Sequence, residues 1–141
     1  MSKVAVVYWS GTGNTQAMAE KVAEGVTSAG GEAVLLTAGE FSAADVASYD
    51  TFAFGCPSMG NEVLEEGEFQ PMWDDVKSSL SGKKVGLFGS WGWGGGVWMT
   101  SWVEEAFSLG INLVNDGVTC CGPADDETEA NLLELGKALA A

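Results

Sequence analysis

The sequence predicts an α/β protein built on a mostly parallel sheet, because two kinds of segment alternate along it. Short apolar runs alternate along the 141 residues with stretches in which apolar residues recur at helical spacing. This alternation is typical of βαβ units, in which right-handed helical crossovers join parallel strands. The length fits a single domain, 1–141, and neither a repeat nor a linker suggests a second one.

Five segments are expected to be strands and four to be helices. The first apolar run, 3–9, is bounded by a glycine-containing loop, which predicts a buried strand. Met18, Val22 and Val26 recur four residues apart and predict one face of the helix that follows. The other expected strands are 33–36, 51–56, 84–90 and 112–119, the last interrupted at 115–117, and the expected helices are 15–29, 68–80, 97–109 and 126–140, with a further helical turn within 41–48.

Composition excludes several classes of protein. Hydrophobic residues make up 46% of the chain, yet no apolar run approaches the roughly 20 residues of a membrane span. No cleavable signal pattern precedes the first strand, and three cysteines without metal-ligand spacing indicate reduced thiols, so we expect a cytoplasmic protein. We also expect it to be a monomer. The absence of histidine excludes Ser–His and Cys–His nucleophiles and histidine metal sites.

The charge balance constrains the partners. Twenty acidic and six basic residues give a formal net charge of −14. Nucleic acid and anionic membranes are poor partners for such a surface. A basic protein is the natural complement, unless the charge serves solubility alone.

The loop after the first strand has the composition of a phosphate site. It reads Ser10-Gly11-Thr12-Gly13-Asn14-Thr15, with two glycines and four side-chain donors, and it contains no Lys or Arg. Backbone N–H groups and the start of the next helix would add further donors. Neutral donors suit a phosphate monoester that is never transferred. The alternative is an ordinary strand-to-helix turn in which Asn14 or Thr15 caps the helix.

Two later loops have the composition of an apolar slot. Met59 lies in the loop after the third strand, where a large thioether can contact an aromatic ring. Two tryptophans, Trp91 and Trp93, lie among glycines after the fourth strand, and a flat ligand would offset the cost of ordering that loop. We expect one tryptophan to pack on the protein and Trp93 to face the ligand. Together with the phosphate loop, the slot predicts flavin mononucleotide, FMN.

These residues are also where the chain resembles a known family, the flavodoxins, particularly the short clostridial type. Segment 8–15 is similar to their phosphate loop, and segments 55–62 and 88–94 are similar to their two flavin loops. The resemblance covers essentially the whole chain. It implies a flavodoxin-like three-layer α/β/α sandwich with a five-stranded parallel sheet in the order 2-1-3-4-5. It also implies a low-potential one-electron carrier with non-covalent FMN, which replaces ferredoxin between redox enzymes and is not itself an enzyme.

Matching positions imply the roles of individual residues. The phosphate would be bound by Ser10, Thr12, Asn14 and Thr15, the flavin rings would lie between Met59 and Trp93, and Glu62 would accept the flavin N3–H. The Gly60 carbonyl would turn to receive N5–H in the one-electron-reduced state. The full expected cofactor site is Ser10, Gly11, Thr12, Gly13, Asn14, Thr15, Pro57, Ser58, Met59, Gly60, Asn61, Glu62, Ser90, Trp91, Gly92, Trp93 and Gly94.

Acidic residues near the first flavin loop have two interpretations. Glu62, Glu65, Glu66 and Glu68 would form a docking rim for basic redox partners such as reductases and ferredoxin-dependent enzymes, or else a solvated helix start. A rival function is an FMN-dependent NAD(P)H:quinone reductase, which would need room for nicotinamide beside the flavin. Met59 and Trp93 are expected to cover the ring instead.

Overall fold

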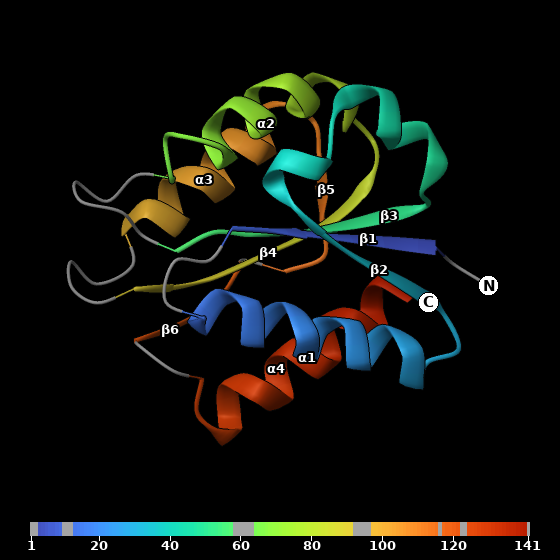
Figure 1. Cartoon of the computed structure of the whole chain (residues 1–141), viewed down its shortest axis with the longest axis vertical. Coiled ribbons are helices and arrows are strands. Elements are labelled where there is room, and N and C mark those ends of the chain that lie inside the picture. Colours follow the sequence, from blue (N-terminus) through green and yellow to red (C-terminus); the bar gives the residue numbers. More distant parts are fainter. Residues whose placement is uncertain are drawn as a thin grey trace.

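The computed structural model describes residues 3–9, 13–57, 64–91, 97–115, 117–121 and 124–140. They form a parallel sheet with a layer of helices on each face (Figure 1). The strands are β1 (Lys3–Tyr8), β2 (Glu32–Thr37), β3 (Thr51–Gly55), β4 (Lys84–Trp91), β5 (Asn112–Leu113) and β6 (Val118–Cys121).

The order of the strands confirms the sequence prediction. The path through the sheet is β2-β1-β3-β4-β5, and β6 also pairs with β4. β5 lies beside Lys84 and Val85, whereas β6 lies beside the segment from Phe88 to Trp91. The two short strands are therefore halves of one fifth strand, separated at the predicted interruption, and the order is 2-1-3-4-5.

The helices also agree with the expected positions, within a few residues. They are α1 (Asn14–Ser28), α2 (Phe69–Val76), α3 (Val97–Ser108) and α4 (Asp126–Ala140). The helical turn expected within 41–48 is a 3₁₀ helix, η2 (Ala43–Ser48), and two others are η1 (Ala38–Glu40) and η3 (Lys77–Ser79). None of the helices within the described residues is both long and apolar enough to cross a membrane.

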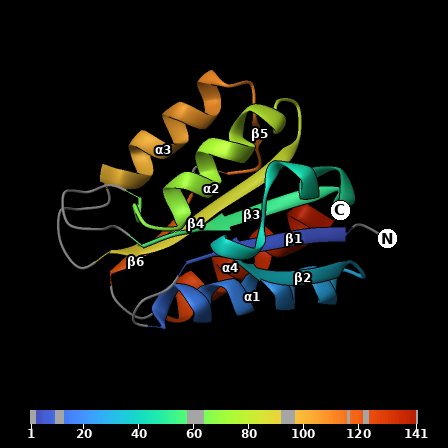
Figure 2. The same cartoon turned by 45° about the horizontal axis from the view of Figure 1, so that its top comes forward.

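The core has two halves because side chains alternate across the sheet. Val4 and Val6 pack with α1 and α4, and Ala5 and Val7 pack with α2 and α3. Figure 2 shows these two pairs of helices on opposite faces of the sheet. α1 and α4 approach each other very closely at Gly136. A Cβ atom there would fall well inside contact distance of the Val22 carbonyl oxygen. Close helix packing therefore depends on this glycine.

The half of the core beneath α2 and α3 is rich in tryptophan. Trp98 and Trp102, one helical turn apart in α3, are each 2% exposed, so both pack on the protein. The Trp102 ring lies edge-on to Phe69 and Trp73 of α2, with ring centroids 5.4 Å and 5.6 Å away. Aromatic contacts of this geometry join α2 and α3.

Candidate functional site

The carboxyl ends of β1, β3 and β4 lie side by side at one edge of the sheet, at the left of Figure 1. The Trp9 N–H donates to the Gly55 carbonyl oxygen at 3.1 Å, and the Cys56 N–H donates to the Phe88 carbonyl oxygen at 3.1 Å. β2 and β3 lie on opposite sides of β1, so the chain order reverses there. In open α/β sheets, ligands bind at the carboxyl edge at such a reversal.

The structure describes part of the site that the sequence predicts. Gly13, Asn14, Thr15, Pro57, Ser90 and Trp91 are described. Ser10, Gly11, Thr12, Ser58, Met59, Gly60, Asn61, Glu62, Gly92, Trp93 and Gly94 lie outside the described residues. The described residues flank all three predicted loops, so they fix where each loop leaves and enters the sheet and helices.

The start of α1 has the features of an anion site. Gly13 is the N-cap residue, with a φ of 96°, a left-handed conformation that glycine adopts without strain. Within the described residues, no side chain makes a cap hydrogen bond to α1, and no acidic residue lies in its first turn. The alternative in which Asn14 or Thr15 caps the helix is therefore wrong, because both residues lie inside it. The backbone N–H groups in the first turn give this end of α1 a partial positive charge, which favours an anion.

Thr15, in the first turn of α1, has a buried hydroxyl group that lacks a hydrogen-bond partner among the described residues. The residue is 1% exposed, and its Oγ1 has no hydrogen-bond partner among the residues that the structure describes. An unpaired buried hydroxyl costs about 1–3 kcal/mol. A phosphate oxygen would satisfy it, and neutral hydroxyl, amide and backbone donors suit the phosphate monoester of FMN. The residues present therefore fit the phosphate end of this cofactor.

The end of β3 holds a residue whose importance the sequence does not reveal. Cys56 is fully buried, and burial raises the pKa of its thiol to about 12. Its Sγ accepts the Glu65 N–H at 3.3 Å, and its carbonyl oxygen accepts the Trp98 indole N–H at 3.2 Å. The sequence predicts only a reduced thiol, because nothing local indicates these distant partners.

The end of β4 holds Trp91, the first of the two loop tryptophans, whereas Trp93 lies outside the described residues. Trp91 is half-buried and packs against the half of the core beneath α2 and α3. Ser90 is buried at 5% exposure. Cys120 and Cys121 of β6 pair with Ser90 and Trp91, so a fourth segment leaves the same edge.

The acidic segment before α2 proves to be partly structural. The Glu65 carboxylate accepts backbone hydrogen bonds from Gly67, Glu68 and Phe69 at 2.7–2.9 Å. Partial burial alone would raise the pKa of Glu65, but these three hydrogen bonds outweigh it and hold that pKa below its ordinary value. Glu65 therefore caps α2 as a charged group. Glu66 and Glu68 are exposed, and Glu62 lies outside the described residues.

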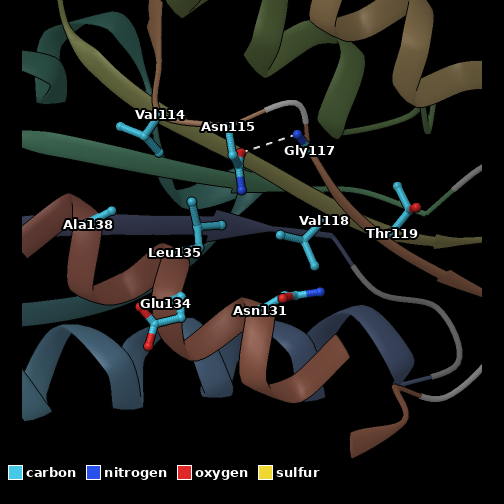
Figure 3. A pocket seen from close by; sticks show the side chains of 9 residues that line it. All are labelled: Val114, Asn115, Gly117, Val118, Thr119, Asn131, Glu134, Leu135 and Ala138. Carbon is cyan, nitrogen blue, oxygen red and sulfur yellow. Dashed lines mark hydrogen bonds between the residues drawn. The ribbon is translucent and has the colours of Figure 1, made fainter. Parts of the chain in front are cut away.

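A cavity of about 580 Å³ lies away from these loops, between the fifth strand and α4. Figure 3 shows Asn131 and Leu135 of α4 facing Val118 of β6 across it. The Asn115 side chain at its rim accepts a hydrogen bond from the Gly117 N–H at 3.2 Å. None of the residues predicted to bind the cofactor lines this cavity, so it is not the expected flavin site.

Comparison with known proteins supports the same assignment. The flavodoxin family model matches residues 6–135. A flavodoxin from Megasphaera elsdenii is 42% identical over 137 residues, which cover 97% of this chain and 98% of that protein. A flavodoxin from Clostridium beijerinckii is 39% identical over 135 residues, which cover 96% and 97%.

The structural comparison extends the likeness to the backbone. The solution structure of two-electron reduced M. elsdenii flavodoxin superposes with a TM-score of 0.89 at 41% identity, and it covers 97% of this chain and 98% of that one. Neither the sequences nor this structure favours a quinone reductase. The chain belongs to the flavodoxin family, and it is a short FMN-containing carrier of electrons at low potential rather than a catalyst.

Proposed function

We propose that FMN is held with its phosphate at the start of α1 and its rings between the loops that follow β3 and β4. Ser10, Thr12, Asn14 and Thr15 are the proposed phosphate donors, and Met59 and Trp93 the proposed ring contacts. The buried Thr15 hydroxyl, which has no hydrogen-bond partner in the described part of the chain, supports this placement most directly because it lies in the first turn of α1. When bound, FMN takes up and releases single electrons.

The chain's contribution to the low potential is electrostatic. None of the segments that follow the strands at this edge contains Lys or Arg, although they contain acidic residues that include Glu40, Glu62, Glu65, Glu66, Glu68 and Asp125. No side-chain cation there can offset the negative charge of a reduced cofactor. One like charge about 10 Å away costs roughly 1.7 kcal/mol at an effective dielectric constant of about 20. For one electron that equals about 70 mV toward lower potential.

A binding experiment on the apoprotein tests the placement of the phosphate. Apoprotein is titrated with FMN and with riboflavin, which lacks the phosphate, and flavin fluorescence gives the two dissociation constants. We expect one FMN per chain and riboflavin binding weaker by at least a hundredfold, since several donors would lose a charged acceptor. Equal affinity for the two flavins would show that the start of α1 does not bind the phosphate.

We also propose that the acidic residues at this edge form a docking rim for basic redox proteins. The rim consists of Glu62, Glu65, Glu66 and Glu68. The segments at this edge contain no Lys, whereas Lys3 and Lys84 lie at the opposite, amino-terminal ends of β1 and β4, where Glu32 and Asp50 also lie. An approaching basic protein would be oriented with its positive surface toward the proposed flavin edge. In the cytoplasm, the compartment that we propose, thiols such as Cys56 remain reduced.

The docking proposal is tested by neutralising charges at the two edges. The variant Glu66→Gln/Glu68→Gln removes two exposed rim charges, and Glu32→Gln/Glu104→Gln is a control with the same change of net charge elsewhere. The assay is the rate of electron transfer to a basic c-type cytochrome. In water, two unit charges about 10 Å apart interact by roughly 0.4 kcal/mol, so each rim charge should change the rate about twofold at low salt.

The rim variant should therefore react about fourfold more slowly than the unmodified protein, and the difference should fade above about 0.1 M salt, where the Debye length is near 10 Å. The control variant should change the rate by much less. If both variants slow the reaction equally, the net charge acts without a specific rim. If the rate does not depend on salt, charge does not steer the encounter.

A further inference from the structure

Cys56 makes hydrogen bonds to elements that flank both predicted flavin loops. It follows β3 directly and is fully buried. Its backbone N–H donates to the Phe88 carbonyl oxygen of β4 at 3.1 Å. Its carbonyl oxygen and its sulfur each accept a further hydrogen bond, from Trp98 and from Glu65. One buried residue thus connects β3 to β4, to α3 and to the segment before α2.

The thiol closes the first predicted flavin loop at its base. The Glu65 N–H donates to Cys56 Sγ at 3.3 Å, so the two ends of segment 57–64 are tied to each other. The Glu65 carboxylate in turn caps α2, and the neighbouring Leu64 is 7% exposed. Because burial raises the thiol pKa to about 12, the group stays protonated, and it donates to the Pro57 carbonyl oxygen at 3.5 Å. Both ends of this loop are therefore held by described contacts.

The carbonyl oxygen of Cys56 contacts the element that follows the second predicted flavin loop. Trp98 is the second residue of α3, and its Nε1–H donates to that oxygen at 3.2 Å within the core. Gly89 makes the approach possible. A Cβ atom at this position would clash with the Cys56 carbonyl oxygen and would lie 3.0 Å from the Trp98 ring. The end of the second loop is thus fixed relative to the start of the first.

We propose that Cys56 and Trp98 are positioning residues that couple the two flavin loops, so that the loops hold the flavin rings at one fixed separation. This inference rests on the proposed placement of FMN between the loops. Neither side chain needs to touch the cofactor. Loss of either hydrogen bond would leave a buried polar group unsatisfied and would let one loop end move relative to the other. The affinity for the flavin rings should then fall, while phosphate binding at α1 is unaffected.

The chain offers a matched pair of variants for the test. Trp98→Phe removes the indole donor to Cys56. Trp102→Phe makes the same change one turn later in α3, at a residue that is equally buried but whose Nε1 has no partner among the described residues. The measurements are the dissociation constants of the apoprotein for FMN and for riboflavin, the FMN reduction potentials, and the urea unfolding midpoint of the apoprotein.

We expect Trp98→Phe to weaken FMN and riboflavin binding by the same factor, about tenfold, and to shift the FMN reduction potentials. Trp102→Phe should leave both dissociation constants within about twofold and the potentials unchanged, because it removes no hydrogen bond between described residues. If Trp98→Phe changes only the unfolding midpoint, or if both variants weaken flavin binding equally, Trp98 is a core residue and the proposal is wrong.

A second pair of variants examines the thiol. Cys56→Ser keeps a hydrogen-bond acceptor near the Glu65 N–H and should bind FMN nearly as tightly as the unmodified protein. Cys56→Ala removes the acceptor and should resemble Trp98→Phe. Equal affinities for Cys56→Ser and Cys56→Ala would overturn the role of the thiol. Failure of the proposed FMN placement is recognised separately, since the unmodified protein would then fail to prefer FMN over riboflavin.

Discussion

Replacing Thr15 by valine should change the stability of the apoprotein and its affinity for FMN in opposite ways. The side chain is 1% exposed and its hydroxyl has no partner among the described residues. Valine has nearly the same shape and a similar helix propensity, so the substitution removes the hydroxyl and little else. An unpaired buried hydroxyl costs about 1–3 kcal/mol. At the lower end of that range, the apoprotein should gain about 1 kcal/mol, or roughly 3 °C in melting temperature.

The same substitution should weaken FMN binding. A hydrogen bond to a charged group contributes about 1.5–3 kcal/mol, which corresponds to a roughly 10- to 150-fold higher dissociation constant. Riboflavin binding should not change, because riboflavin offers no phosphate. Urea denaturation of the apoprotein and fluorescence titration with both flavins measure the three quantities.

Thr27→Val is the matched control in the same helix. The Thr27 hydroxyl is exposed and donates to the Ala23 carbonyl oxygen at 3.0 Å, so its loss should change both stability and FMN affinity little. The reasoning is refuted if Thr15→Val leaves the FMN dissociation constant within twofold of the unmodified protein. It is also refuted if FMN and riboflavin lose affinity equally.

Three further predictions concern the scaffold. Gly136→Ala should lower the free energy of unfolding, measured by urea denaturation, by about 2 kcal/mol. The new methyl group would clash with the Val22 carbonyl oxygen, and this clash outweighs a gain of roughly 1 kcal/mol in helix propensity. A higher free energy of unfolding would contradict the close packing of α1 and α4. Glu65→Gln should cost about 1 kcal/mol at pH 7. Since the folded-state pKa of Glu65 is lowered, its contribution is present above the ordinary value of 4.5 and is lost as the pH falls through the lowered pKa, so the variant and the unmodified protein should converge in acid; a pH-independent difference would argue against it. Asp125→Ala should destabilise α4 by about 1 kcal/mol in thermal unfolding, because its carboxylate accepts the Thr128 N–H at 2.8 Å; an unchanged melting temperature would exclude that cap.

Local sequence patterns predicted most of the fold. Apolar runs such as 3–9 and the spacing of Met18, Val22 and Val26 report directly on strand and helix periodicity, and the observed elements agree within a few residues. The interruption at 115–117 was also visible in the sequence. The cofactor was predicted from the composition of three loops and again from their resemblance to a family, whereas the strand order came from that resemblance; both are confirmed.

The roles of single residues in contact with distant parts of the chain depend on the tertiary structure. Glu65 looked like one of several solvated or docking acids, yet its carboxylate caps α2. Asn14 and Thr15 looked like equal candidates for a helix cap, yet the helix begins at Asn14 and the Thr15 hydroxyl is buried without a partner among the described residues.

The amino-acid sequence by itself determined the alternation of strands and helices, the cation-free loops and the resemblance to flavodoxins, because periodicity and composition are local properties. Only the tertiary structure decided that Cys56 meets Trp98 and Glu65, and that Cys121 lies beside Trp91. Such contacts join residues up to tens of positions apart. They exist only once the strands are ordered and the helices pack on the sheet.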